Sequence, residues 1–137
     1  MENILNKKIL LQKTGLVQAL ERLNEALSYQ NSQIPARLDV DAAIQRFEFC
    51  YELSWKLMQS IIRYKGKDGQ SPRDCFRTAA QLGIINNPDK WIEYLDARNL
   101  TVHTYDQSTA DLVYKVAKQF TTDVSGLLES VDNILNE

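Results

Sequence analysis

The sequence has little of what turn-rich folds and metal sites require. Its 137 residues include only five glycines and three prolines, about half the usual share in globular proteins. We therefore do not expect a β-sandwich, a β-barrel or a nucleotide-binding fold that holds phosphates in a glycine-rich loop. Histidine occurs once, as His103, and cysteine twice, as Cys50 and Cys75. A zinc site needs three or four ligands at close spacing, and neither C-x-x-C nor H-x-x-x-H is present. Histidine-dependent chemistry therefore has a single candidate in each chain, and no metal site is expected.

The chain also lacks a long apolar run and a strong charge of either sign. No stretch approaches the roughly 20 apolar residues that span a bilayer, and the start, MENILNKKILLQK, has no signal-peptide pattern. The net charge of −2 argues against a protein that coats duplex nucleic acid, but it does not exclude a local basic patch. Two cysteines without a motif are typical of a reducing compartment and of small buried apolar side chains. We expect a cytoplasmic protein that does not bind membranes.

Apolar periodicity and turn signals predict an all-α fold. The hydrophobic content of 44% and the charged content of 25% are ordinary for a domain that buries a core. Glycine and proline cluster at three places, which divide the chain into helical segments with apolar residues spaced by three and four. The expected helices cover residues 3–29, 39–65, 72–82, 88–104 and the segment after Ser108. We expect one domain over residues 1–137, an up-and-down four-helix bundle with an additional short helix.

Local signals fix several helix ends. Ser71 followed by Pro72 predicts a cap and first turn, Gly83 predicts the end of that helix, and Asn87 before Pro88 repeats the start signal. Ser108 is the expected cap of the last helix. The 39–65 segment is apolar on most sides and should be the most buried helix. Helices of roughly 27 residues extend about 40 Å, longer than a compact bundle of this size needs, so we expect apolar surface to remain and a homodimer to cover it.

The densest polar group lies between residues 96 and 106. At 100° per residue, Asp96, Asn99 and His103 share one helix face, whereas Arg98 and His103 lie about 140° apart. The arginine and the histidine can converge if the helix loosens near its end or if the arginine curls round on its long side chain. An exposed polar helix end with an ordinary histidine explains the same residues.

Two further charged groups have alternative interpretations. Glu48 and Glu52 form a helical stripe with Lys56, typical of surface ion pairs, but one of these glutamates could instead anchor Arg98 or His103 beside a cleft. Residues 56–77 carry six basic and two acidic side chains. This segment is either a solvated loop or a phosphate-contacting rim, and the candidates for RNA contact in it are Lys65, Lys67, Arg73 and Arg77.

The same residues carry a family resemblance. The run Arg98-Asn-Leu-Thr-Val-His103-Thr-Tyr105 resembles the Arg-x4-His-x-Tyr signature of HEPN-domain proteins, and it is most similar to HepT-type toxins that pair with a minimal nucleotidyltransferase. Proteins of this group are also described as nucleotidyltransferase substrate-binding proteins. RFEFCYELSWKLM, SPRDCFRTAAQLGII and WIEYLDARNLTVHTY resemble the second, third and fourth helices of the family, in order. The resemblance covers nearly the whole chain.

The resemblance implies a dimeric helical bundle in which two motifs face one cleft. It implies metal-independent cleavage of RNA without a cofactor. The candidate catalytic residues are then Arg98, His103 and Asn99, and the charged groups described above add Glu48, Glu52 and Asp96 as candidate supporting residues. It also implies a nucleotidyltransferase partner that neutralises the toxin by attaching AMP to Tyr105. Two alternatives stay open, namely a non-catalytic subunit that binds substrate or nucleotide for a two-component nucleotidyltransferase, and a bundle that only mediates protein association.

Overall fold

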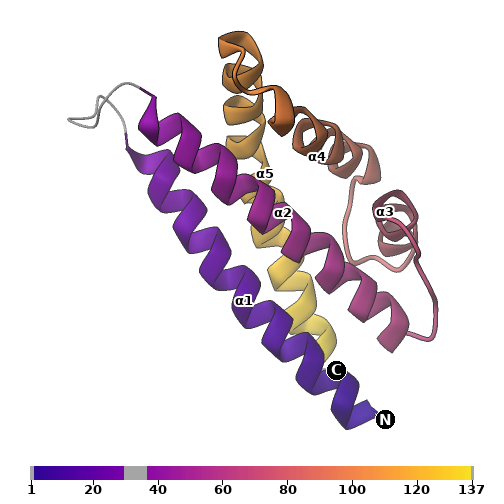
Figure 1. The fold of residues 1–137 in the computed structure, drawn as a ribbon. Coiled ribbons are helices and arrows are strands. Elements are labelled where there is room, and N and C mark those ends of the chain that lie inside the picture. The colour runs from indigo at the N-terminus through magenta and orange to yellow at the C-terminus, as the bar shows by residue number, and fades with distance from the viewer. Residues whose placement is uncertain (1, 30–36, 137) are drawn as a thin grey trace.

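The computed structural model describes residues 2–29 and 37–136, and these residues form helices without any strand (Figure 1). The elements are α1 (Glu2–Ser28), α2 (Leu38–Tyr64), α3 (Pro72–Gln81), α4 (Pro88–Leu100), the short 3₁₀ helix η1 (Thr101–His103) and α5 (Gln107–Leu135). The prediction of an all-α fold with three long and two shorter α-helices is confirmed.

The three long helices form one side of the molecule, and α3 and α4 complete it (Figure 1). Helices α1 and α2 lie side by side in opposite directions, and α5 packs against both of them. Helices α3 and α4 pack on α2 away from α1, and α4 also contacts α5. This arrangement places the end of α4, where the polar group lies, between α2 and α5.

The predicted helix ends agree with the structure at most positions. Ser71 caps α3 by accepting a hydrogen bond from the Asp74 N–H, and Asn87 caps α4 in the same way through the Lys90 N–H. Gly83 follows α3 with a φ of 76°, a left-handed conformation that favours glycine. Residues 31–36 of the predicted first loop lie outside the described residues.

Two sequence predictions at helix ends were wrong. The helix predicted over residues 88–104 stops being α-helical after Leu100 and continues only as η1. The cap of α5 is Asp106 rather than Ser108, because the Asp106 carboxylate accepts the Thr109 N–H at 3.0 Å. Ser108 instead donates its hydroxyl to that same carboxylate. Both differences fall within the predicted functional group, so they bear directly on its geometry.

A buried aromatic cluster holds α4 against the rest of the bundle. It contains Phe47, Tyr51, Phe76, Trp91, Tyr94 and Phe120, which come from α2, α3, α4 and α5. Tyr94 contacts Phe120 edge-on at a centroid distance of 5.1 Å, and its hydroxyl donates a hydrogen bond to Asp123. Because Arg98 lies one helical turn after Tyr94, this cluster fixes the part of α4 that carries Arg98.

The second helix is the most heavily buried, as the sequence predicted, with eleven buried residues. Both cysteines are buried, and burial raises the pKa of the Cys50 thiol to about 12 and that of Cys75 to about 11. The two thiols are therefore protonated at neutral pH and act as apolar side chains. Within residues 2–29 and 37–136, no helix is long and apolar enough to cross a bilayer.

Candidate functional site

The first element of the site is an arginine that helix α4 holds against two glutamates of α2. Arg98 Nε donates to Glu52 Oε1 at 3.2 Å, and Arg98 Nη1 lies 3.9 Å from Glu48 Oε2. The Arg98 side chain is 30% exposed, and the two glutamates are only slightly more exposed. Their shared face on α2 is thus an anchor for the guanidinium, one of the two interpretations that the sequence left open.

The carboxylate of Glu52 is itself held from a second direction. Trp55 donates its indole N–H to Glu52 Oε2 at 3.0 Å, so each oxygen of the carboxylate has its own donor. This fixes the orientation of Glu52 and, through it, that of Arg98. Sequence reasoning did not assign Trp55 a role, although its position three residues after Glu52 on a helix is the signal that would have found it.

The second element is the histidine at the end of η1. His103 is exposed, and its ring lies edge-on to that of Tyr105 with a centroid distance of 6.0 Å. The Tyr105 side chain is 87% exposed, which leaves its hydroxyl open to solvent or to a partner. In the described chain no hydrogen bond joins Arg98 to His103. The motif therefore forms two neighbouring pairs, Arg98 with its glutamates and His103 with Tyr105.

Short local hydrogen bonds shape the backbone that carries His103. The Thr101 hydroxyl donates to the Arg98 carbonyl at 2.7 Å, and the Thr104 hydroxyl donates to the Thr101 carbonyl at 3.0 Å. Thr101 is also buried. Threonine hydroxyls that bond to carbonyls three residues earlier compete with the regular helix. These bonds explain why the regular α-helix ends at Leu100 and tightens into η1 within the motif.

Asp106 closes this segment and begins α5. Its carboxylate accepts hydrogen bonds from Ser108 and from the backbone and hydroxyl of Thr109, and these bonds lower the pKa of Asp106 below its ordinary value. Its own N–H donates to the His103 carbonyl at 3.1 Å. Asp106 is thus a positioning residue for the motif that the sequence analysis did not name.

The remaining predicted residues of the motif are not drawn into one cluster. Asp96 pairs with Arg73 of α3 at 3.6 Å rather than with the histidine. Asn99 is exposed, and in the described chain its side chain makes no hydrogen bond to the His103 ring. In the folded chain Asp96 links α3 and α4. The predicted supporting role of Asp96 and the predicted role of Asn99 both stay predictions.

The predicted basic rim lies mostly away from this site. Lys65 and Lys67 are exposed in the loop that follows α2, and Arg77 is exposed on α3. Glu52 and Lys65 are thirteen residues apart, so this loop begins about 20 Å along the helix axis from the Arg98 contact. Arg73 is closer, through its ion pair with Asp96. Within the described ranges no three His, Cys, Asp or Glu side chains gather where they could hold a metal ion.

Comparison with known proteins identifies the family. Residues 12–133 match the family described as nucleotidyltransferase substrate binding protein like. A protein of Haemophilus influenzae named probable ribonuclease HepT is 40% identical over 97 residues, which cover 67% of this chain and 66% of that protein. The aligned part is thus slightly less than two thirds of that relative's length.

Solved structures agree with this fold. A Haemophilus influenzae protein, described as having the fold of a substrate-binding domain of a nucleotidyltransferase, is 31% identical, with a TM-score of 0.68 over 96% of this chain and 99% of that one. A tri-AMPylated HEPN toxin of Shewanella oneidensis, solved in complex with an MNT antitoxin, has a TM-score of 0.75 at 22% identity, over 91% of this chain and 96% of that one. The second likeness concerns the fold alone. With the family match over most of the sequence, these findings show that the chain belongs to the nucleotidyltransferase substrate-binding protein-like family.

Proposed function

We propose that this chain is the ribonuclease toxin of a toxin–antitoxin pair, and that it cleaves RNA without a metal. The observation that carries the proposal is the pairing of Arg98 with Glu52 beside an exposed His103, within the sequence Arg-x4-His-x-Tyr. The identity of 40% to a probable ribonuclease HepT supports it.

The chemistry needs one base and one acid. In RNA cleavage the 2′-hydroxyl attacks the neighbouring phosphorus and gives up its proton to a base, while the bond to the 5′-oxygen breaks and that oxygen receives a proton from an acid. Imidazole performs either role near neutral pH. Arg98 would stabilise the charge that develops on the phosphoryl oxygens, because a guanidinium offers planar paired donors. Asn99 would orient the histidine ring.

The count of histidines makes a dimer part of the proposal. Each chain supplies one imidazole, so base and acid would come from the His103 residues of two chains across a two-fold axis. Exposure of His103 and of its neighbour Val102, which is 68% exposed, is consistent with a surface that a second chain could approach.

The proposed partner is a small nucleotidyltransferase that inactivates the toxin. The Tyr105 oxygen would attack the α-phosphorus of ATP and displace pyrophosphate, which leaves AMP attached through a phosphodiester. Tyr105 is 87% exposed and adjoins His103, so the added phosphate and base would block the cleft and repel RNA. Incubation with the partner and ATP should add AMP to the wild-type chain and not to Tyr105→Phe, as read by intact mass.

Cleavage by the purified chain tests the ribonuclease proposal. We expect His103→Ala to cleave single-stranded RNA about 10²- to 10⁴-fold more slowly than the wild type in the presence of a chelator. Gln107→Ala is the matched control, since Gln107 is exposed close to the motif but outside it. Circular dichroism should show equal helix content in all three proteins. If the folded wild type leaves RNA intact, the proposal is wrong.

The second candidate function is a substrate-binding subunit without catalytic activity. It is favoured by the family description and by the relative described as a nucleotidyltransferase substrate-binding domain. In that case the Arg98 site would hold a nucleotide or acceptor for the partner enzyme. Titration of the folded chain with nucleotides, together with the absence of cleavage, would separate this function from the first.

A further inference from the structure

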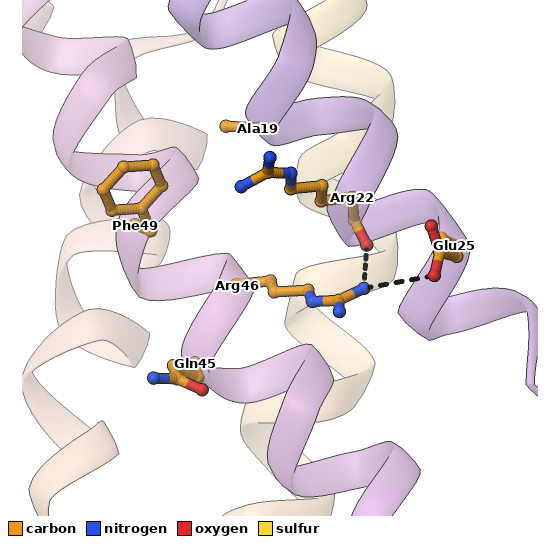
Figure 2. A pocket seen from close by; sticks show the side chains of 6 residues that line it. All are labelled: Ala19, Arg22, Glu25, Gln45, Arg46 and Phe49. Atoms are coloured by element: carbon orange, nitrogen blue, oxygen red, sulfur yellow. Dashed lines mark hydrogen bonds and ion pairs between the residues drawn. The ribbon is translucent and has the colours of Figure 1, made fainter.

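A groove between α1 and α2 lies outside the motif and has a composition suited to a nucleotide. It encloses about 420 Å³ and is lined by Ala19, Arg22, Glu25, Gln45, Arg46 and Phe49 (Figure 2). Two of these side chains carry guanidinium groups, one carries a carboxylate and one an amide, and the other two are apolar, one of them the aromatic ring of Phe49. Neither the helix periodicity nor the charge pattern of the sequence singled out these residues.

The aromatic ring is unusual for its position. Phe49 is 61% exposed, although it lies in the middle of the most heavily buried helix, between the buried residues Phe47 and Cys50. Keeping this ring in water forgoes the free energy that its burial would provide. An exposed phenyl ring beside positive charge is the arrangement on which single-stranded nucleic-acid proteins stack bases.

The two arginines of the groove differ in what they bind. Arg46 is satisfied, since its Nη1 donates to the Arg22 carbonyl at 2.8 Å and lies 3.8 Å from Glu25 Oε1. The Arg22 guanidinium has no hydrogen bond or ion pair within residues 2–29 and 37–136. Figure 2 shows its side chain extending from α1 toward Phe49, in the direction opposite to Arg46. An unpaired guanidinium pointing into a groove is suited to bind an anion.

A second hollow adjoins the groove and leads toward the partners of the motif arginine. Gln45 and Phe49 also line a shallower hollow on α2, whose other residues are Glu48 and Glu52. Those two glutamates are the partners of Arg98. A chain-like ligand that lies across Phe49 would therefore run from Arg22 toward the two glutamates that hold Arg98. The carboxylates of Glu48 and Glu52 repel a phosphate, so the phosphates of such a ligand would lie at the arginines and a base would lie over the Phe49 ring.

We infer that this groove is a subsite for single-stranded RNA, in which Phe49 stacks on a base and Arg22 binds the adjoining phosphate. The subsite would direct the strand toward Arg98. This inference rests on the function proposed above, and it specifies unpaired RNA as the class of substrate. The requirement for an unpaired strand follows from the ring, because a base must leave the duplex stack before it can lie on Phe49.

Binding of RNA to a non-cleaving background tests the subsite. In the His103→Ala chain, fluorescence anisotropy with a short labelled single-stranded RNA measures Kd. We expect Phe49→Leu to raise Kd about tenfold and Phe49→Tyr to leave it near the background value. Arg22→Gln should reduce the slope of log K against log salt by about 0.7, whereas Arg22→Lys should preserve that slope. Leu11→Ala and Lys8→Gln, which change exposed residues of α1 outside the groove, are the matched controls.

The outcomes separate the subsite from the proposed activity. Unchanged Kd values for both Phe49→Leu and Arg22→Gln would overturn the subsite, even if the wild type cleaves RNA. Loss of binding in those variants would support the subsite, even if the wild type fails to cleave. AMP that binds as tightly as the RNA, with the same dependence on Phe49, would overturn the inference that a strand occupies the groove. Light scattering shows whether Phe49→Leu converts a dimer into monomers. That result would mean that a second copy of the chain covers this face, and it would also overturn the inference of an RNA subsite.

Discussion

Arg98 is the side chain whose geometry the fold controls most closely. Tyr94, one turn earlier, is locked into the aromatic cluster, and Glu52 binds the guanidinium while Trp55 holds Glu52. Since these groups are about one-third exposed, the ion pair itself contributes little to stability. The ion pair instead holds the remaining guanidinium donors in a fixed orientation. A group that stabilises a transition state needs such an orientation.

Replacement of Arg98 by lysine tests this orientation. A lysine ammonium keeps the charge but cannot donate to Glu52 and to a phosphoryl oxygen in the planar geometry of a guanidinium. We expect Arg98→Lys to lower kcat for RNA cleavage about 10²-fold while the midpoint of urea unfolding stays nearly constant. Arg37→Lys is the control, because Arg37 forms an ion pair with Asp111 and belongs neither to the motif nor to the candidates for RNA contact. Equal activity of Arg98→Lys and the wild type would show that charge alone suffices.

Sequence reasoning reached part of this site and missed the rest for physical reasons. The stripe formed by Glu48 and Glu52 predicted either surface ion pairs or an anchor for Arg98 or His103, and the contact with Arg98 agrees with the second possibility. The exposure of Phe49 could not be predicted, because α2 is apolar on most sides. Which of these sides stays open to solvent depends on how α1 and α4 pack against α2. Ion pairs that depend on tertiary placement, such as that between Asp96 and Arg73, could likewise not be predicted from the sequence.

The end of α4 is the element on which the site depends. An α-helix continued to Thr104 would place Arg98 and His103 about 140° apart. The hydrogen bond of the Thr101 hydroxyl and the cap of α5 at Asp106 end the regular helix before that point. The helix pattern alone predicted continuity, since local threonine bonds and the competing cap are not visible in apolar periodicity. Helix number, type and most ends were predictable because proline, glycine and capping residues mark them.

Asp106 makes the start of α5 sensitive to acid. Hydrogen bonds from Ser108 and Thr109 lower the pKa of Asp106, so its stabilising effect is present above the unfolded pKa of about 3.9 and is lost as the pH falls through the lower folded value. We expect the Tm difference between the wild type and Asp106→Asn to be largest at neutral pH and to shrink at strongly acidic pH. Thermal unfolding followed by circular dichroism at several pH values measures it. A difference that is independent of pH would show that the charge has no part in the cap.

Helix α1 contains a position at which a substitution should stabilise the fold. Gly15 lies inside α1, and a Cβ added there meets no atom within 4 Å. Gly15→Ala should raise the free energy of unfolding by up to about 1 kcal/mol, because alanine is the better helix former. Gly83→Ala is the control with the opposite sign. Because Gly83 has a φ of 76°, alanine at this position should lower the free energy of unfolding by about 1 kcal/mol. Urea unfolding measures both, and destabilisation by Gly15→Ala would contradict the open environment of that position.

On the scale of the whole molecule, apolar and aromatic side chains remain in water on several faces. Leu11, Phe49, Val102 and Tyr105 are each more than 60% exposed. The length of the helices predicted surface of this kind, but it did not predict where it would lie. A single chain also contains one histidine, so the proposed cleavage requires two chains that share one cleft.

The most direct test of the account is the activity of a mixed dimer. Coexpression of a wild-type chain and a His103→Ala chain with different tags, followed by purification on both tags, yields dimers with one histidine. If base and acid come from the two His103 residues, this mixed dimer should cleave RNA as slowly as the His103→Ala homodimer. Retention of about half of the wild-type activity would show that each chain acts alone, and it would contradict the account.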